Sequence, residues 1–198
     1  MATLSVGGTT VFDGSALQSG VTGALTTGVT FPAGHIIQTV MSSPFTTTES
    51  TTSTSGVDTS VFSIITPLKN NSKILVFGSI AVGVNTGGAY GGSVWMSRSQ
   101  AGGETDTIII VGDGDGVRTR GTGGIYSDSI NYQQFIIPTC YLDSPTIPTT
   151  PVAITYRYKF KSGWASPNGI YINRGGADSN SASFTRVSSY ITLIEVAG

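Results

Sequence analysis

The stretch ITYRYKFK at residues 154–161 decides the fold, because apolar and polar side chains alternate along its whole length. A period of two places Tyr156, Tyr158 and Phe160 on one face of a strand and the cations on the other. The stretch is therefore predicted to be a half-buried antiparallel strand, with Arg157, Lys159 and Lys161 directed towards solvent or a neighbour.

Two other stretches, 73–84 and 187–196, are apolar on both faces. In the second, Val187, Ile191 and Leu193 share one face, and the opposite face holds Tyr190, Ile194 and Val196. A strand of this kind in an antiparallel sheet needs a second layer, or another subunit, over its outer face. We therefore expect Tyr190, Ile191, Leu193 and Ile194 to serve both the core and a contact between copies of the chain.

Further strand-like runs are separated by segments rich in turn residues, and no segment shows a helical apolar stripe. These runs span 35–41, 58–65, 92–99, 106–111, 132–137 and 169–173. The polar, low-complexity segment 46–56 is predicted to be a mobile loop. The pattern predicts an all-β chain folded as an antiparallel β-sandwich or jelly roll.

Residues 1–34 are rich in Gly, Thr and Ser, and their apolar residues are too sparse for a core. We interpret them as an extended N-terminal arm that orders on a partner surface, or alternatively as a disordered terminus. Residues 35–198 then form the head domain.

The composition is low in charge and high in small hydroxyl residues, with 28 Thr, 25 Ser, 27 Gly and a net charge of −1. A near-neutral surface favours association between copies. The ten scattered cations argue against nucleic-acid binding, which requires clustered basic residues. No apolar run reaches the roughly 20 residues of a membrane span, and no secretory signal is visible, so synthesis in a cytoplasm is expected.

Residues suited to catalysis are few: one His, one Cys and three Glu. His35 is expected to be structural or on the surface, and Cys140 to be a buried, packed thiol. One His and one Cys also fall short of a protein-only zinc site within one chain. A glycosidase would need a carboxylate pair, for which Glu104, Asp106, Asp113 and Asp115 are candidates. The chain lacks the repeats of β-helical depolymerases, so no enzymatic activity and no cofactor are expected.

The segment Gly112–Gly116 alternates Gly with Asp113 and Asp115. Such a loop can present carboxylate and carbonyl oxygens to Ca²⁺, although the late Glu of an EF-hand loop is missing. The alternative is a solvated turn in which these carboxylates pair with Arg118 or Arg120.

A recognition surface is predicted at Arg157, Lys159, Lys161 and Trp164. Aromatic rings stack on sugars, and neighbouring cations add cation–π attraction. Trp95, Asp143 and Tyr171 are further candidates for this surface. The alternative is a solvated strand face with Trp164 over a sheet edge.

Three stretches resemble small virion structural proteins of marine tailed bacteriophages. They are FPAGHIIQTV at 31–40, SVFSIITPLKNNSKILVFGSIAV at 60–82 and YLDSPTIPTTPVAITYRYKFKSG at 141–163, followed by GIYINRGGADSN and a final SSYITLIEVAG. The closing strand is also similar, more loosely, to the last strand of trimeric C1q/TNF-like jelly rolls.

The resemblance implies a homotrimeric β-sandwich head on an N-terminal attachment segment. We therefore expect a non-enzymatic virion protein that is made in the host cytoplasm and contacts tail or capsid proteins through residues 1–34. A short fibre would present the head to a host surface glycan, with no membrane insertion. The alternative is a capsid decoration, or cement, protein, which also suits a short arm and a compact body.

Overall fold

A computed structural model of the chain describes residues 3–6, 9–13, 16–17, 32–85, 90–127, 133–164 and 169–198. The chain divides into two compact units, Met1–Phe31 and Pro32–Gly198. In the first unit, three strands pair antiparallel in chain order: β1 (Thr3–Val6), β2 (Thr9–Asp13) and β3 (Ala16–Leu17). The predicted arm, 1–34, lies largely outside the described residues.

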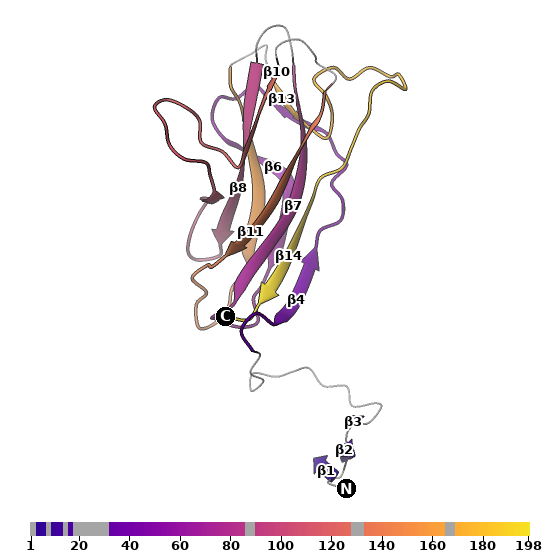
Figure 1. Cartoon of the computed structure of the whole chain (residues 1–198), viewed down its shortest axis with the longest axis vertical. Coiled ribbons are helices and arrows are strands. Elements are labelled where there is room, and N and C mark those ends of the chain that lie inside the picture. The colour runs from indigo at the N-terminus through magenta and orange to yellow at the C-terminus, as the bar shows by residue number, and fades with distance from the viewer. Residues whose placement is uncertain are drawn as a thin grey trace. The chain divides into compact units, whose positions relative to one another are not determined.

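The second unit, the head, consists of two antiparallel sheets (Figure 1). We call them the β7 sheet and the β12 sheet after their central strands. The β7 sheet contains β4 (Ile36–Met41), β5 (Glu49–Thr51), β7 (Lys73–Val84), β11 (Phe135–Asp143), β13 (Ile170–Ile172) and β14 (Tyr190–Val196). The β12 sheet contains β6 (Val57–Ile65), β8 (Tyr90–Gln100), β9 (Thr107–Ile110), β10 (Gly123–Ser127) and β12 (Ile154–Ser162).

The strand pairing is that of a jelly roll. Setting aside the short β5, β9 and β13, the first strand pairs with the last, and the remaining strands pair in nested order. The pairs are β4 with β14, β6 with β12, β7 with β11 and β8 with β10. Such nested antiparallel pairing builds the two Greek keys of a double-sheet jelly roll. The structure describes no helix, and the predicted all-β fold class is confirmed.

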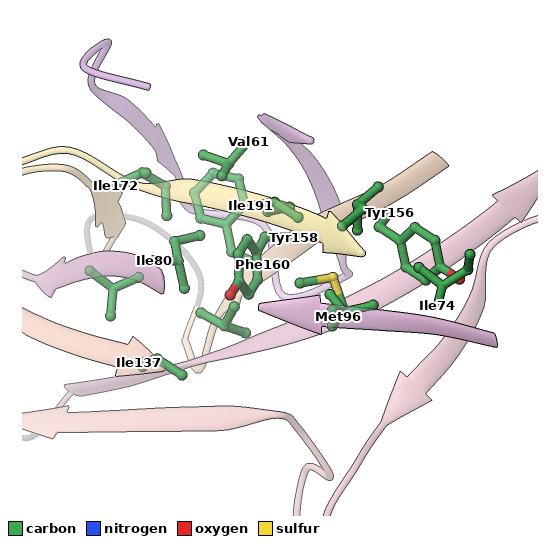
Figure 2. Packing of buried hydrophobic residues seen from close by; sticks show 14 of the residues in the cluster. Val61, Ile74, Ile80, Met96, Ile137, Tyr156, Tyr158, Phe160, Ile172 and Ile191 are labelled. Carbon is green, nitrogen blue, oxygen red and sulfur yellow. The ribbon is translucent and has the colours of Figure 1, made fainter. Parts of the chain in front are cut away.

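The core forms between the two sheets and is built around β12, as the alternation predicts. Tyr156 and Tyr158 are fully buried and Phe160 is 2% exposed. Figure 2 shows these rings among aliphatic side chains of the facing sheet, including Ile80 and Ile191. Burying each such side chain stabilises the fold by about 1.5–3 kcal/mol. The two tyrosine hydroxyls still need partners in this core.

Both hydroxyls find those partners on β11. The hydroxyl of Tyr158 donates to Thr139 Oγ1 at 2.8 Å, and that of Tyr156 donates to Asp143 Oδ2 at 2.8 Å. Burial, above all, raises the pKa of both tyrosines well above the ordinary value. The hydroxyls therefore stay neutral and act as links between the β12 sheet and the β7 sheet.

Two expectations about local structure are wrong. Residues 46–56 are not only a loop, because Glu49–Thr51 forms β5 and pairs with β13. The Thr-rich sequence suits a strand, and the Glu49 carboxylate accepts a hydrogen bond from Ser60 N at 2.9 Å. Cys140 is exposed rather than buried, because it lies on the outward-facing side of β11.

Candidate functional site

The outward-facing side of the β7 sheet, which we call the apolar face, is a candidate interaction surface. The strand register places its side chains in rows across β11, β7, β14 and β4. One row contains Cys140, Phe77, Thr192 and Met41; the next contains Leu142, Leu75, Ile194 and Thr39; a third contains Pro138, Ser79 and Tyr190. On these four fully described strands, the only outward charged residue is Lys73, at the beginning of β7.

Large apolar side chains on this face are open to solvent in the isolated chain. The exposed fractions are 74% for Met41, 55% for Ile136, 46% for Leu142, 45% for Tyr190 and 39% for Phe77. Single exposed apolar residues are ordinary, but a contiguous patch marks a site of interaction. The inward side of β14 differs, since Ile191 and Leu193 are fully buried. Among the predicted contact residues, Tyr190 and Ile194 thus lie on the apolar face, and Ile191 and Leu193 in the core.

The outward-facing side of the β12 sheet, the charged face, holds three of the four predicted recognition residues. Arg157 Nη1 lies 2.5 Å from Asp58 Oδ2, and Lys159 Nζ lies 3.2 Å from Asp58 Oδ1. Lys159 also forms an ion pair with Asp106. Burial opposes the charge of Lys159, but its hydrogen bonds to Asp106 and Asp58 outweigh burial and raise its pKa. These two cations are therefore already neutralised within the chain.

The aromatic part of the predicted recognition surface is divided. Lys161 Nζ lies 5.9 Å from the centre of the Trp95 ring, and Trp95 Nε1 donates to Arg120 O at 2.6 Å. Trp164 follows the end of β12 and is half exposed. Tyr171 belongs to β13 in the other sheet and stacks beneath Arg174. The structure thus brings Trp95 to the cations and places Tyr171 elsewhere.

Asp143, the remaining candidate, is buried in a polar network at one end of the sandwich. Arg98 Nη1 donates to both its carboxylate oxygens, at 2.7 and 2.6 Å, and Arg98 also pairs with Glu104. Burial opposes the charge of Arg98, but these carboxylates outweigh it and raise its pKa. With Tyr156, the network joins β8, β11 and β12 and is complete without a ligand.

The candidate carboxylates of the calcium and glycosidase hypotheses lie mostly in ion pairs. Asp115 pairs with Arg118, Asp106 with Lys159 and Glu104 with Arg98. Asp113 Oδ1 accepts a hydrogen bond from Gly114 N in its own exposed loop at 2.8 Å. Among the described residues, no group of three or more His, Cys, Asp or Glu could hold a metal ion.

His35 is exposed and lies just before β4, where Ala197 N donates to its carbonyl at 2.8 Å. Sequence reasoning missed a second polar site, the loop 174–186 that joins β13 to β14. The signal that was available is its density of Arg, Asp, Asn and Ser after a strand.

Comparison with known proteins adds no family assignment: no family model matches the chain, and no curated protein matches it. Within the ranges that the structure describes, no helix is long and apolar enough to cross a membrane.

Proposed function

We propose that this chain is a non-enzymatic structural protein of a bacteriophage virion, the head of a short receptor-binding fibre that assembles as a homotrimer. The observation that supports assembly most directly is the apolar face. It spans β11, β7, β14 and β4, is open in the isolated chain and has one charged residue, Lys73, at its margin.

A second copy of the same chain is the partner that this face fits. Two identical faces repel one another when they are charged, and the apolar face has almost no charge to cause repulsion. Covering Met41, Phe77 and Leu142 removes apolar area from water at roughly 25 cal/mol per Å². Closed symmetry is the usual outcome for such homo-oligomers. Three-fold symmetry follows from the resemblance to phage virion proteins.

Attachment to the virion is assigned to residues 1–34. This segment is rich in Gly, Thr and Ser, and its apolar residues are mostly spaced apart, which suits a chain that orders on a partner. The compact head unit begins at Pro32, within the last three residues of this segment. The tail or capsid proteins of the particle are the partners expected for this segment.

The test is the mass of the purified full-length chain in solution, together with its copy number in the particle. We expect the mass of a trimer by analytical ultracentrifugation, and a copy number matching the fibres of a tail. A monomer at micromolar concentration would overturn the assembly proposal. A trimer present in numbers comparable to the capsid protein would identify a decoration protein instead.

A further inference from the structure

The loop 174–186 is flanked by two fully buried residues, Asn173 and Ser189. Asn173, fully buried with a φ of 62°, donates from Nδ2 to the carbonyls of Phe45 at 2.8 Å and Thr47 at 2.9 Å. Its Oδ1 accepts from Ser189 Oγ at 2.6 Å. Asn is one of the few residues that tolerate this left-handed conformation. The network therefore holds both ends of the loop in place.

The base of the loop is also packed against the end of β7. A Cβ atom on Gly83 would lie 2.5 Å from the carbonyl oxygen of Arg174, and one on Gly176 would lie 2.2 Å from that of Val84. Arg174 and Arg186 form an antiparallel bridge across the neck. Close approach of this kind is possible because glycine has no side chain. A fixed scaffold below a polar loop is the usual setting of a binding site.

Two arginines flank one carboxylate inside this loop. Arg186 donates to Asp178 through Nη2 at 2.6 Å and through Nε at 3.3 Å, and Arg174 Nε lies 3.9 Å from Asp178 Oδ2. The hydrogen bond from Arg186 is the main cause of the lowered pKa of Asp178, which is ionised at neutral pH. Arg174 is further held by stacking 4.0 Å from the centre of the Tyr171 ring.

Above this ion pair lies a hollow of about 500 Å³, lined by Asp178, Ser179, Asn180, Ser181, Phe184 and Arg186. The volume lies within the usual range of small-molecule sites. Two backbone hydrogen bonds shape its rim, from Ser181 N to Ser179 O at 2.8 Å and from Phe184 N to Ser181 O at 3.0 Å. Its lining combines carboxylate, guanidinium, amide and hydroxyl groups with one aromatic ring.

We infer that this hollow binds one sugar unit of a glycan. Neighbouring sugar hydroxyls both donate and accept hydrogen bonds, which matches a carboxylate beside a guanidinium and an amide. Phe184 adds an aromatic side chain to this lining. A phosphate group would be repelled by the carboxylate of Asp178. An apolar ligand would leave the polar groups of the lining without hydrogen-bond partners.

The position of the hollow agrees with a receptor-binding head. The loop packs on Gly83 and Val84, at the end of β7. The start of β4 lies at the other end of this strand, because Ile36 pairs with Val196, and Val196 pairs with Lys73, the first residue of β7. Twelve residues at about 3.3 Å each separate these ends by roughly 40 Å. The loop therefore lies at the end of the head opposite the start of β4 (Figure 1). The identification of the ligand as a host-surface glycan rests on the proposed function.

Saturation-transfer NMR on the full-length chain tests this inference. The probes are methyl glycosides of glucose, galactose, mannose and N-acetylglucosamine, and glucuronic acid, each at millimolar concentration. We expect transfer to at least one sugar, and affinity at least about tenfold weaker in Asp178→Asn and in Asn180→Ala, because each loses hydrogen bonds to hydroxyls. Asp115→Asn, which breaks the exposed pair with Arg118 in another loop, is the matched control and keeps full binding.

Absence of transfer to all five sugars would overturn the inference, as would equal affinity in the two loop variants and the wild type. Failure of the proposed assembly has a different signature. If the chain binds sugar but sediments as a monomer, the sugar site is supported and the trimer is contradicted. If it sediments as a trimer but gives no sugar signal, the trimer is supported and the sugar site is contradicted.

Discussion

The two outward faces of the head differ although the sheets beneath them are built alike. On the charged face, Arg157 and Lys159 meet Asp58 and Asp106, so each charge has a partner within the same chain. On the apolar face, exposed side chains such as Met41 have no charged neighbour on the four strands apart from Lys73. One face therefore pairs its charges within a single chain, and the other leaves large apolar side chains open to solvent.

The largest expected effect is on the oligomeric state, and it is tested by placing one new charge on each face at matched positions. Leu142 and Ile64 lie outward on the edge strands β11 and β6 and are 46% and 47% exposed. Leu142→Asp would bury an unpaired carboxylate between copies at a cost of several kcal/mol, so we expect it to dissociate the oligomer. The carboxylate introduced by Ile64→Asp stays in contact with water, so this variant is expected to leave the oligomer intact. Analytical ultracentrifugation of both variants distinguishes the two results.

Cys140 provides a check that requires no substitution. Its thiol lies on the apolar face in the same row as Phe77 and is exposed in the isolated chain. We expect a bulky maleimide to label it slowly in the assembled protein and rapidly after dilution into monomers. Equal labelling of oligomer and monomer, or dissociation by Ile64→Asp alone, would show that the copies meet through another surface.

The second largest effect is expected on the free energy of unfolding, from the buried polar network that joins the two sheets. Arg98 and Asp143 are buried, with side-chain exposures of 8% and 7%. Asp143→Asn leaves a buried guanidinium short of its partner, and removing one member of such a pair costs about 3–5 kcal/mol. Asp115→Asn breaks an exposed pair and costs less than about 1 kcal/mol. Urea unfolding monitored by tryptophan fluorescence measures both, and equal losses would contradict the structural role of the network.

A third effect, on stability, comes from the inward side of β7, across the sheet from the apolar face. A Cβ atom on Gly78 would lie 2.5 Å from the hydroxyl oxygen of Tyr158 and 3.3 Å from the carbonyl oxygen of Tyr190. Gly78→Ala is therefore expected to cost about 1–3 kcal/mol by overpacking while leaving the oligomeric state unchanged. Adding Tyr158→Phe removes the closest atom and should restore part of the loss. A double-mutant cycle measured by thermal unfolding tests this, and strict additivity would argue against the contact.

The alternation in ITYRYKFK was sufficient to predict that Tyr156, Tyr158 and Phe160 are buried, because period two is a local property of the strand. The apolar character of 187–196 on both faces predicted a strand covered on both sides. Ile191 and Leu193 are buried in the core, and a cover over Tyr190 and Ile194 stays a prediction. Cys140 was placed wrongly because the preference of free thiols for burial was used without the register of β11. Knowing that Cys140 pairs with Phe77 would have corrected it.

The ion pairs of the charged face could not be derived in this way. Asp58 and Asp106 reach Lys159 from β6 and from a turn far away in sequence, and a local pattern contains no information on such pairing. The same holds for the sugar-binding hollow. Its residues are visible in the sequence, but their rigid base depends on Asn173, Phe45 and Thr47 meeting across the fold.

The smallest expected effect is the pH dependence of the charged face. Burial raises the pKa of Asp58, but hydrogen bonds from Lys159 and Arg157 outweigh this and lower it below the ordinary 3.8. The stability that the ionised Asp58 contributes to the folded state is therefore present above pH 3.8. It is lost as the pH falls through the lower pKa that Asp58 has in the folded chain. Because Asp58 is half exposed, solvent screening limits the effect to at most about 1 kcal/mol. Asp58→Asn should remove this part of the acid dependence. Asp113→Asn, at a carboxylate for which the described residues provide no ion pair, is the control and should leave it in place.

Lys159 gives the opposite sign, since its raised pKa contributes stability below pH 10.5 that is lost at higher pH. The apolar face, in contrast, presents no carboxylate on its four strands. Acidification from pH 7 to 4 should therefore leave the sedimentation coefficient of the assembled protein unchanged. Dissociation at pH 4 without loss of near-ultraviolet circular dichroism would mean that carboxylates hold the copies together, and would reverse the roles assigned to the two faces.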